Sequence, residues 1–490
     1  MSIQKRLDGR LLINGVLIAA QNPSTAVHNP ATGEVVAMTG SAHPQEIEAA
    51  VAAARAAFQS WSGLPGKARA KCLHRLGDLI EADADAMAQL MTLEQGKPVN
   101  EARGEILKLA ETCHFYAEEA SRIHGETVPN DSTDFDSIIV REPIGVVGAI
   151  TPWNYPAELV GWKLCGALAA GCTIIIKPAE ITPFTALAIG EKCIEAGIPA
   201  GVVNVVTGPG AVVGQALVEH PGVDKIAFTG SSKVGLHIQK SATTVKRMAL
   251  ELGGNCPMIV TRSADLDAAV KGAVRRSYRN CGQICIAINR IYVDRQVYDE
   301  FLQKLAVGAE ALTVANGLEF PAADLGAMAS AEPLNKTQEH LADAVSKGAR
   351  LLAGGARPNG AEFKNGHFFR PTVLADCTHE MLIMTEETFG PIVGVAPFET
   401  LQEAVQLAND TPYGLASYVY AKGADEIRFL SRLLDYGNVA VNTVDAGIIN
   451  APYGGRKQSG VGYEHGREGM LEYMNFKHIR VRFDMPSEGI

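Results

Sequence analysis

Three short stretches of the sequence carry the side chains that a reaction at a carbonyl carbon requires. Cys285 ends the run Asn-Cys-Gly-Gln-Ile-Cys, and a cysteine thiolate is a strong nucleophile toward a carbonyl carbon. Glu251, in Glu-Leu-Gly-Gly, offers a carboxylate that can activate water. Asn154, in Thr-Pro-Trp-Asn, offers an amide N–H that can hold the oxygen that turns negative during the attack. Each stretch supplies one part of a single reaction.

The elements that must position these residues begin with apolar strands that alternate with helices. Strands are expected at 144–150, 173–176, 202–206 and 225–228, and helices from Pro156 to 170, at 183–196, at 210–219 and from Ser231 onward. Apolar strands separated by helices are typical of a parallel sheet covered on both faces. A nucleotide would sit at the carboxyl ends of these strands.

Flanking segments extend this framework on both sides. Residues 1–40 read as short strands and turns. Apolar residues at helical spacing predict helices at 44–60, 67–91 and 98–123. After Glu251 a second α/β unit is expected, with strands at 371–374 and 393–396 and helices at 401–409 and 424–434. A chain of 490 residues exceeds what one core usually supports, so two large domains are predicted.

Two motifs at strand ends suit a dinucleotide. Gly230 and Ser231 follow a strand and open a helix, where exposed N–H groups suit a pyrophosphate, although an N-capping serine after a tight turn gives the same pattern. Glu180 follows another strand, close to Lys177. A carboxylate there can accept both hydroxyls of an adenosine ribose and would repel a 2′-phosphate, although an exposed turn glutamate is the alternative. A ribose-binding Glu180 favours NAD over NADP.

Composition narrows the possible partners. The net charge of −10 argues against nonspecific nucleic-acid binding, which needs clustered Lys and Arg. Nine cysteines, an odd number spread through the chain, fit a reducing cytosol, and we expect a cytoplasmic protein. No signal peptide or apolar run long enough for a membrane span is evident. Cys281 and Cys285 have no partner pair nearby, so no metal site is expected.

Taken together, the motifs resemble those of the aldehyde dehydrogenase superfamily, in the same order and over nearly the whole chain. The matching stretches begin at Thr151, Lys177, Phe228, Glu251, Gly282, Glu386 and Pro452. Seven ordered motifs are far more specific than any one of them.

The resemblance implies a role for each chemical residue. Cys285 would attack the aldehyde, Asn154 and the Cys285 backbone N–H would hold the oxyanion, and hydride would leave for the nicotinamide. Glu251 would then activate water to hydrolyse the thioester, with Glu464 as a possible proton relay. The positions that match family cofactor contacts are Trp153, Lys177, Glu180, Gly230, Ser231, Glu387 and Phe389.

Substrate choice depends on three further positions. The surroundings of Arg279 resemble the succinate-semialdehyde dehydrogenase branch, in which the matching arginine helps bind the far carboxylate of the substrate. An arginine in a solvated ion pair is the alternative. The chain departs from that branch, because Trp162 stands where a second arginine is expected and Asn450 lies in a segment where that branch has serines.

We therefore expect an NAD-dependent dehydrogenase of a small, acid-bearing aldehyde. The alternatives are a dehydrogenase of a neutral or hydroxylated aldehyde, a cofactor-independent thiol esterase and a noncatalytic oligomeric protein. Cys281 lies close to the nucleophile in sequence, and a reversible disulfide under oxidation is a hypothesis for it.

The architecture also follows from the resemblance. It implies a Rossmann-type NAD-binding domain at 1–120 and 142–253, an α/β catalytic domain at 254–458, and a small β oligomerisation flap at 121–141 and 474–490. Residues 137–141 and 476–483 alternate in strand fashion, and unpaired strands need a partner. Pairing across subunits, as in related enzymes, predicts a homodimer or homotetramer.

Overall fold

An eight-stranded sheet forms the first half of the molecule. The computed structural model describes residues 7 and 9–483. The strand order is β2-β1-β9-β8-β7-β10-β11-β21. The five central strands run parallel, as the alternating sequence pattern predicts. They are β7 (Val146–Ile150), β8 (Thr173–Lys177), β9 (Val203–Val205), β10 (Lys225–Thr229) and β11 (Arg247–Glu251). The antiparallel edges are β1 (Leu11–Ile13), β2 (Val16–Ile18) and β21 (Gly460–Val461).

Helices cover both faces of this sheet, because successive strand residues point to opposite sides. Ile174 and Ile176 pack into one apolar core, while Ile175 packs into the other. The helices of this half are α2 (Pro44–Ser62), α3 (Gly66–Ala82), α4 (Ala84–Gln95), α5 (Val99–Ala120), α6 (Glu158–Ala170), α7 (Pro183–Glu195), α8 (Gln215–Glu219) and α9 (Ser232–Ser241). The prediction of one helix over 67–91 is wrong. The chain breaks at Asp83, which leaves helical geometry and pairs with Lys192.

A seven-stranded sheet forms the second half, in the order β14-β15-β16-β13-β12-β18-β19. All neighbours are parallel except β14 and β15. The strands are β12 (Cys256–Val260), β13 (Ile288–Asp294), β14 (Arg350–Ala353), β15 (Thr372–Ala375), β16 (Ile392–Phe398), β18 (Ala416–Tyr420) and β19 (Asn438–Val441). The helices are α10 (Leu266–Tyr278), α11 (Tyr298–Glu310), α12 (Ala331–Ser346), α13 (Leu382–Thr385), α14 (Leu401–Asn409) and α15 (Ala424–Leu433). The last two confirm the helices expected at 401–409 and 424–434.

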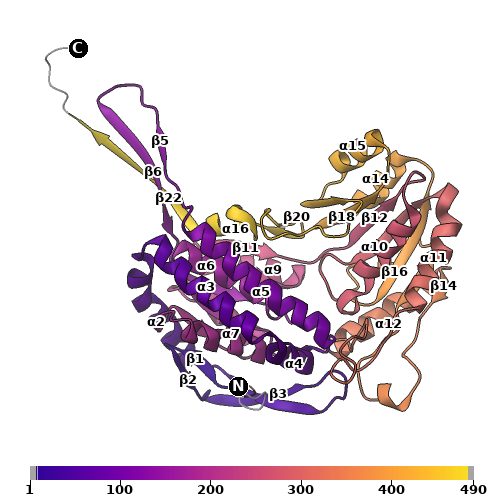
Figure 1. Cartoon of the computed structure of the whole chain (residues 1–490), viewed down its shortest axis with the longest axis horizontal. Helices are drawn as coiled ribbons and strands as arrows, with labels where there is room; N and C mark the ends of the chain where they lie inside the picture. Colours follow the sequence, from indigo (N-terminus) through magenta and orange to yellow (C-terminus); the bar gives the residue numbers. More distant parts are fainter. Residues whose placement is uncertain (1–6, 8, 484–490) are drawn as a thin grey trace.

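The two halves lie next to each other and are connected near β11 (Figure 1). Residues 252–255 lead directly from the carboxyl end of β11 to the amino end of β12. Cys285 lies just before β13 and Glu387 just before β16, so both lie at the amino edge of the second sheet. The carboxyl edge of the first sheet therefore faces the amino edge of the second. The predicted domain limit at 253/254 falls in this connection, whereas residues 459–473, assigned to no domain, return to the first sheet through β21 and α16 (Gly466–Leu471).

A three-stranded arm projects from the first half (Figure 1). Its strands are β5 (Glu126–Val128), β6 (Phe135–Pro143) and β22 (Met474–Arg482), and β6 lies between the other two. The strands expected at 137–141 and 476–483 lie in β6 and β22, which pair with one another along their whole length, and pairing across subunits stays a prediction. The arm still exposes apolar side chains, with Phe476 65% exposed. Residues 484–490 of the predicted flap lie outside the described residues.

The remaining elements are small. Two small antiparallel pairs also occur: β3 (Asn22–His28) with β4 (Val35–Ser41), and β17 (Tyr413–Gly414) with β20 (Arg456–Lys457). Within residues 7 and 9–483, no helix combines the length and apolar character that crossing a membrane requires.

Candidate active site

Two cavities meet at Cys285. The first, which we call the strand-end cavity, measures about 230 Å³ and lies against the carboxyl ends of β10 and β11, where Gly230 and Ser231 line it. The second, which we call the channel, measures about 80 Å³ and is lined by Trp162 and Arg279 among others. Cys285, Asn154 and Leu159 line both. The predicted nucleophile and the predicted oxyanion donor therefore stand together at the junction.

The loop before Cys285 is tightly constrained. Asn280, Cys281 and Gly282 all have positive φ angles, of 49°, 55° and 69°. A Cβ at Gly282 would lie 2.1 Å from the Gly390 carbonyl oxygen, so only glycine fits there. Such a backbone is kept only where the surroundings hold it in place. The loop thus presents Cys285 in a fixed position.

The Cys285 thiol is protonated in this environment. Its pKa is raised to about 12, mainly by burial and also by the carboxyl groups of Glu387 and Glu251, while a contact with the Tyr453 hydroxyl opposes them. That hydroxyl lies 3.6 Å from Sγ. The thiol therefore needs a base before it can attack a carbonyl carbon.

Asn154 is held by its backbone carbonyl. That oxygen accepts hydrogen bonds from Lys97 Nζ at 2.8 Å and from Asn280 Nδ2 at 2.9 Å. The Asn154 side-chain Nδ2 donates to the Gln283 carbonyl at 3.0 Å. Because an amide nitrogen carries two hydrogens, one N–H remains for an oxyanion. Lys97, which sequence reasoning missed, is fully buried and pairs with Glu105 at 2.5 Å.

Glu251 is a buried carboxyl group without a partner. Neither of its oxygens accepts a hydrogen bond within the described part of the chain. Burial raises its pKa well above that of an ordinary glutamate, Glu464 raises it further, and Lys163 lowers it. A protonated carboxyl can remain neutral in such a site and can still act as a base once deprotonated.

Glu464 lies close enough to influence Glu251, but it is tied to another residue. It accepts a hydrogen bond from Lys163 Nζ, which also donates to Thr229 Oγ1 at 2.6 Å. Sequence reasoning missed Lys163. The available signal was a single basic residue in the middle of an otherwise apolar helix, since α6 is buried along almost its whole length.

The strand-end cavity offers the groups that a nicotinamide nucleotide needs. Ser231 caps α9, its Oγ accepting the Val234 N–H at 3.3 Å, so free N–H groups of a ten-residue helix point toward the cavity. Trp153 and Phe389 meet edge to face with ring centroids 5.4 Å apart. Glu387 accepts the Gly254 N–H at 3.0 Å, and burial raises its pKa to about 7. These residues fit a phosphate at one end and a planar ring near Cys285 at the other.

Lys177 and Glu180 lie apart from this cluster. They follow β8 at the same edge of the sheet, and neither lines the strand-end cavity or the channel. Lys177 Nζ lies 3.1 Å from Glu180 Oε2, and Glu180 Oε1 accepts the Gly210 N–H at 3.1 Å. Their position suits the far end of a dinucleotide that begins beside Cys285. Glu332 and Lys336 of α12, which line the strand-end cavity, had no local sequence signal.

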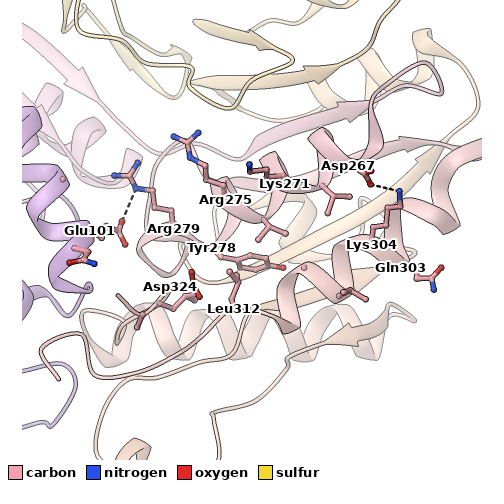
Figure 2. Close-up of a pocket in the computed structure, with 18 residues that line it drawn as sticks. Glu101, Asp267, Lys271, Arg275, Tyr278, Arg279, Gln303, Lys304, Leu312 and Asp324 are labelled. Atoms are coloured by element: carbon pink, nitrogen blue, oxygen red, sulfur yellow. Dashed lines mark hydrogen bonds and ion pairs between the residues drawn. The ribbon is translucent and has the colours of Figure 1, made fainter. Parts of the chain in front are cut away.

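Charged and aromatic side chains both line the channel. Arg279 Nε donates to Glu101 of α5 at 3.2 Å, and Figure 2 shows the two side chains turned toward each other. Trp162 lies opposite with Tyr453 and His465, of which His465 had no assigned role from sequence. A wider cavity, which we call the outer mouth, adjoins the channel and shares Trp162, Arg279 and His465 with it. Asn450 lines the outer mouth but not the channel, so the structure does not bring it to Cys285.

Two further features lie outside the junction. The large groove in Figure 2, between α10 and α11, shares Arg279 with the channel but does not include Cys285.

Cys281 packs into the core of the second half and donates to the Gly326 carbonyl at 3.3 Å. Its role as a redox switch stays a prediction. No cluster of three His, Cys, Asp or Glu suited to a metal occurs among the described residues.

The model of the aldehyde dehydrogenase family matches residues 17–479. The chain is 44% identical to a 3-sulfolactaldehyde dehydrogenase of Pseudomonas putida, over 96% of this chain and 97% of the relative. It is 43% identical to a glutarate-semialdehyde dehydrogenase of Pseudomonas aeruginosa, over 95% and 96%. It is 42% identical to a succinate-semialdehyde dehydrogenase [NADP(+)] of Escherichia coli, over 96% and 97%.

Solved structures agree. An aldehyde dehydrogenase from Brucella melitensis superposes with a TM-score of 0.95 at 43% identity, covering 98% of this chain and 99% of the other. A betaine aldehyde dehydrogenase from Staphylococcus aureus in complex with NAD+ superposes with a TM-score of 0.95 at 38% identity, covering 99% and 96%. The chain therefore belongs to the aldehyde dehydrogenase family, the NAD(P)-dependent oxidoreductases that act on aldehydes.

Proposed function

We propose that the chain oxidises a small, acid-bearing aldehyde to its carboxylate with NAD, through a covalent intermediate on Cys285. The observation that supports this best is the junction itself. Cys285 and Asn154 stand where a nucleotide-sized cavity meets a channel that contains Arg279. The second candidate is a dehydrogenase of a neutral or hydroxylated aldehyde, which the aromatic residues Trp162 and Tyr453 favour.

In this proposal each residue acts at a stated atom. The Cys285 thiol gives up its proton to solvent as its sulfur adds to the aldehyde carbon, and the free Asn154 N–H and the Cys285 backbone N–H hold the resulting oxyanion. Bound in the strand-end cavity, NAD supplies the acceptor for the hydride that the carbon loses. Glu251 then takes a proton from water, which attacks the thioester carbonyl and frees the carboxylate product and the thiol. Because burial raises the pKa of Glu251, its deprotonated carboxylate is a stronger base than that of an ordinary glutamate.

NAD is the proposed cofactor because of Glu180. Its carboxylate lies at the end of β8, where it would accept ribose hydroxyls and repel a 2′-phosphate. Lys177 reduces that repulsion because the two side chains are paired. The named relatives include an enzyme described as NADP(+)-dependent and a structure with NAD+, so the preference is a property to measure in this chain.

An acid-bearing substrate is proposed because of Arg279. Its Nε is engaged by Glu101, which leaves the two terminal nitrogens of the guanidinium for a carboxylate. Three of the relatives named above act on aldehydes that carry a carboxylate or sulfonate, whereas the Staphylococcus aureus enzyme is a betaine aldehyde dehydrogenase. The volume of the channel is far smaller than that of the strand-end cavity on the other side of Cys285, and this small volume suits a short aldehyde.

The experiment that tests the function measures nicotinamide reduction with succinate semialdehyde and with butanal, using NAD and NADP, in the parent and in Arg279→Ala. We expect kcat/KM for succinate semialdehyde to fall by roughly 10- to 100-fold, because a charged hydrogen bond contributes about 1.5–3 kcal/mol. Butanal should change less than about threefold. Arg275→Ala is the control, because Arg275 lies one turn earlier, pairs with Asp445 and lines the outer mouth but not the inner channel.

Other outcomes discriminate between the candidates. Equal losses on both aldehydes would make Arg279 a structural residue. A parent that prefers butanal would favour the second candidate, and rates with NADP at or above those with NAD would reject the role of Glu180.

Lys97 carries a separate prediction about the oxyanion site. In Lys97→Met, Asn154 loses one of its two carbonyl contacts and Glu105 becomes a buried carboxylate without its cation. We expect stability in urea to fall by about 3–5 kcal/mol, because one partner of a buried ion pair is removed. We also expect kcat to fall by about tenfold or more with little change in KM, because the oxyanion forms only after binding.

Two variants control this result. Lys97→Met with Glu105→Gln removes the unpaired charge and should recover part of the stability but not kcat. Arg103→Met breaks an exposed ion pair with Asp85 and should leave both nearly unchanged. If kcat is normal in folded Lys97→Met, Lys97 does not position Asn154.

We also propose that the protein forms a homodimer or homotetramer in the cytoplasm. The three-stranded arm supports the oligomeric state, because β5 and β22 are edge strands within the described structure and β22 exposes Phe476 and Ile479.

A further inference from the structure

One side chain in the channel is buried, and its polar atoms are poorly satisfied. His465 is 4% exposed, and neither Nδ1 nor Nε2 makes a hydrogen bond of good geometry to any residue that the structure describes, although the Ile448 backbone lies close enough to influence the ring. The residue lines both the inner channel and its outer mouth. Buried polar atoms are nearly always satisfied, so an exception beside a cavity indicates a partner that enters from the cavity.

The surroundings place this imidazole beside the path to Cys285. Its ring lies edge-on to Trp162, with centroids 4.1 Å apart, and 5.4 Å from the ring of Tyr453. The Tyr453 hydroxyl in turn lies 3.6 Å from the Cys285 sulfur. His465 is therefore separated from the reacting atom by one aromatic ring. A substrate carbon bonded to Cys285 would extend its next few atoms along this wall.

The backbone at His465 is strained. Its φ of 61° and ψ of 170° lie in a region that glycine adopts almost exclusively. The neighbouring hydrogen bonds hold it there, since Gly466 N–H donates to Ile449 at 2.7 Å and Glu464 N–H donates to Tyr453 at 2.8 Å. A side chain kept in such a conformation, with no contact that satisfies its nitrogens, suits a functional role better than a packing role.

The imidazole is neutral near pH 7. Its pKa is lowered to about 4, mainly by burial and also by the charges of Lys108 and Lys163, while a contact with the Ile448 backbone opposes them. A neutral imidazole offers one N–H donor and one acceptor. It can therefore bind a carboxylate oxygen through the donor and a hydroxyl through either nitrogen.

We propose that His465 determines specificity, by forming a hydrogen bond to an oxygen that the substrate carries beyond its aldehyde carbon. The shared chemistry is a carboxylate or hydroxyl oxygen within a few bonds of the carbonyl. This inference rests on the proposed function, because it assumes that the aldehyde carbon binds to Cys285. In this proposal His465 gives the channel a second polar contact besides Arg279. The contact lies next to Trp162, which stands where an arginine was expected.

The test compares the parent with His465→Phe, which keeps a ring against Trp162 and removes both nitrogens. The substrates are succinate semialdehyde, lactaldehyde and butanal, which carry a carboxylate, a hydroxyl and no second oxygen. We expect kcat/KM to fall about 10- to 100-fold for the oxygen-bearing aldehydes, mainly through KM, and to change less than about threefold for butanal. A loss with only one of the two identifies whether the carboxylate or the hydroxyl is bound.

Two further variants keep the test decisive. His465→Asn retains a donor and an acceptor and should keep part of the discrimination, even if the larger phenylalanine disturbs the fold. Arg279→Ala should reduce turnover of succinate semialdehyde only, whereas loss of the imidazole affects either oxygen. Equal losses on all three aldehydes, or no change on any, would overturn the inference.

The experiment distinguishes failure of the proposed function from failure of the inference about His465. A parent that oxidises none of the three aldehydes rejects that function. Calorimetric titration with succinate and with lactate then tests His465 alone, because both acids carry the oxygen without needing the reaction. Binding to the parent that is weakened at least tenfold in His465→Phe supports the inference, and equal binding or no binding overturns it.

Discussion

Replacing Cys285 with alanine should lower aldehyde oxidation by about four orders of magnitude or more, the loss seen when a covalent nucleophile is removed. The sulfur is the atom on which the two cavities converge, and no other cysteine lines either of them. Alanine removes the nucleophile and leaves Asn154 in place, so the remaining oxyanion donors act on an aldehyde that nothing attacks. Initial rates of nicotinamide reduction measure the effect.

A matched control comes from the same loop. Cys281 is buried against the Gly326 carbonyl and packs in the core of the second half. Cys281→Ala should keep kcat within a few-fold and cost about 1–2 kcal/mol of stability as a small buried side chain is trimmed. NAD binding by Cys285→Ala, followed by fluorescence, confirms that the fold is intact. Residual turnover in Cys285→Ala above a few per cent of the parent, or its loss in Cys281→Ala alone, would contradict the assignment.

Part of the first half of the site could be predicted from strand pattern. Parallel strands end at the same edge of a sheet, so Asn154 and Gly230, which follow the predicted strands at 144–150 and 225–228, had to lie at one edge. The strand β11, which ends at Glu251, was not predicted. Periodicity and the alternation of helices and strands were sufficient for this step, because both are local properties of the chain.

The second half of the site has no such local signal. Cys285 and Glu387 lie at the amino edge of another sheet, and only the four-residue connection 252–255 brings that edge against the first. The pairing of β6 with β22 also has no local signal, because these two strands are far apart in sequence and most of both sheets lies between them along the chain. Only the resemblance to a family placed these residues, since pairing over such distances depends on tertiary packing.

The residues that were missed share a physical cause. Lys97 and Lys163 are fully buried lysines, and their roles arise from partners on other elements. The nitrogens of His465 make no hydrogen bond of good geometry within the described residues. A sequence shows that a charged or polar residue is present, but not whether its partner arrives from another part of the fold. The same limit applies to the break at Asp83, where the apolar spacing of two helices happens to continue across the junction.

Glu251→Gln should stop the reaction after its first half. The glutamine has the same shape but cannot accept a proton, so the thioester on Cys285 forms and is not hydrolysed. We expect a burst of about one nicotinamide reduced per active site, followed by steady turnover that is about 100- to 10,000-fold slower than in the parent. Rapid-mixing absorbance measures the burst, and mass spectrometry of the quenched protein identifies the acyl group on Cys285.

The pH dependence gives a second readout of the same residue. Because burial and Glu464 raise the pKa of Glu251, its basic form becomes populated only above the usual glutamate range, and parent hydrolysis should increase with pH until that pKa is passed. Glu464→Gln removes a neighbouring negative charge and frees the Lys163 cation, and both changes lower the pKa of Glu251. The rise should therefore move to lower pH in Glu464→Gln and disappear in Glu251→Gln. A Glu251→Gln enzyme with no burst, or with the pH profile of the parent, would show that another group activates the water.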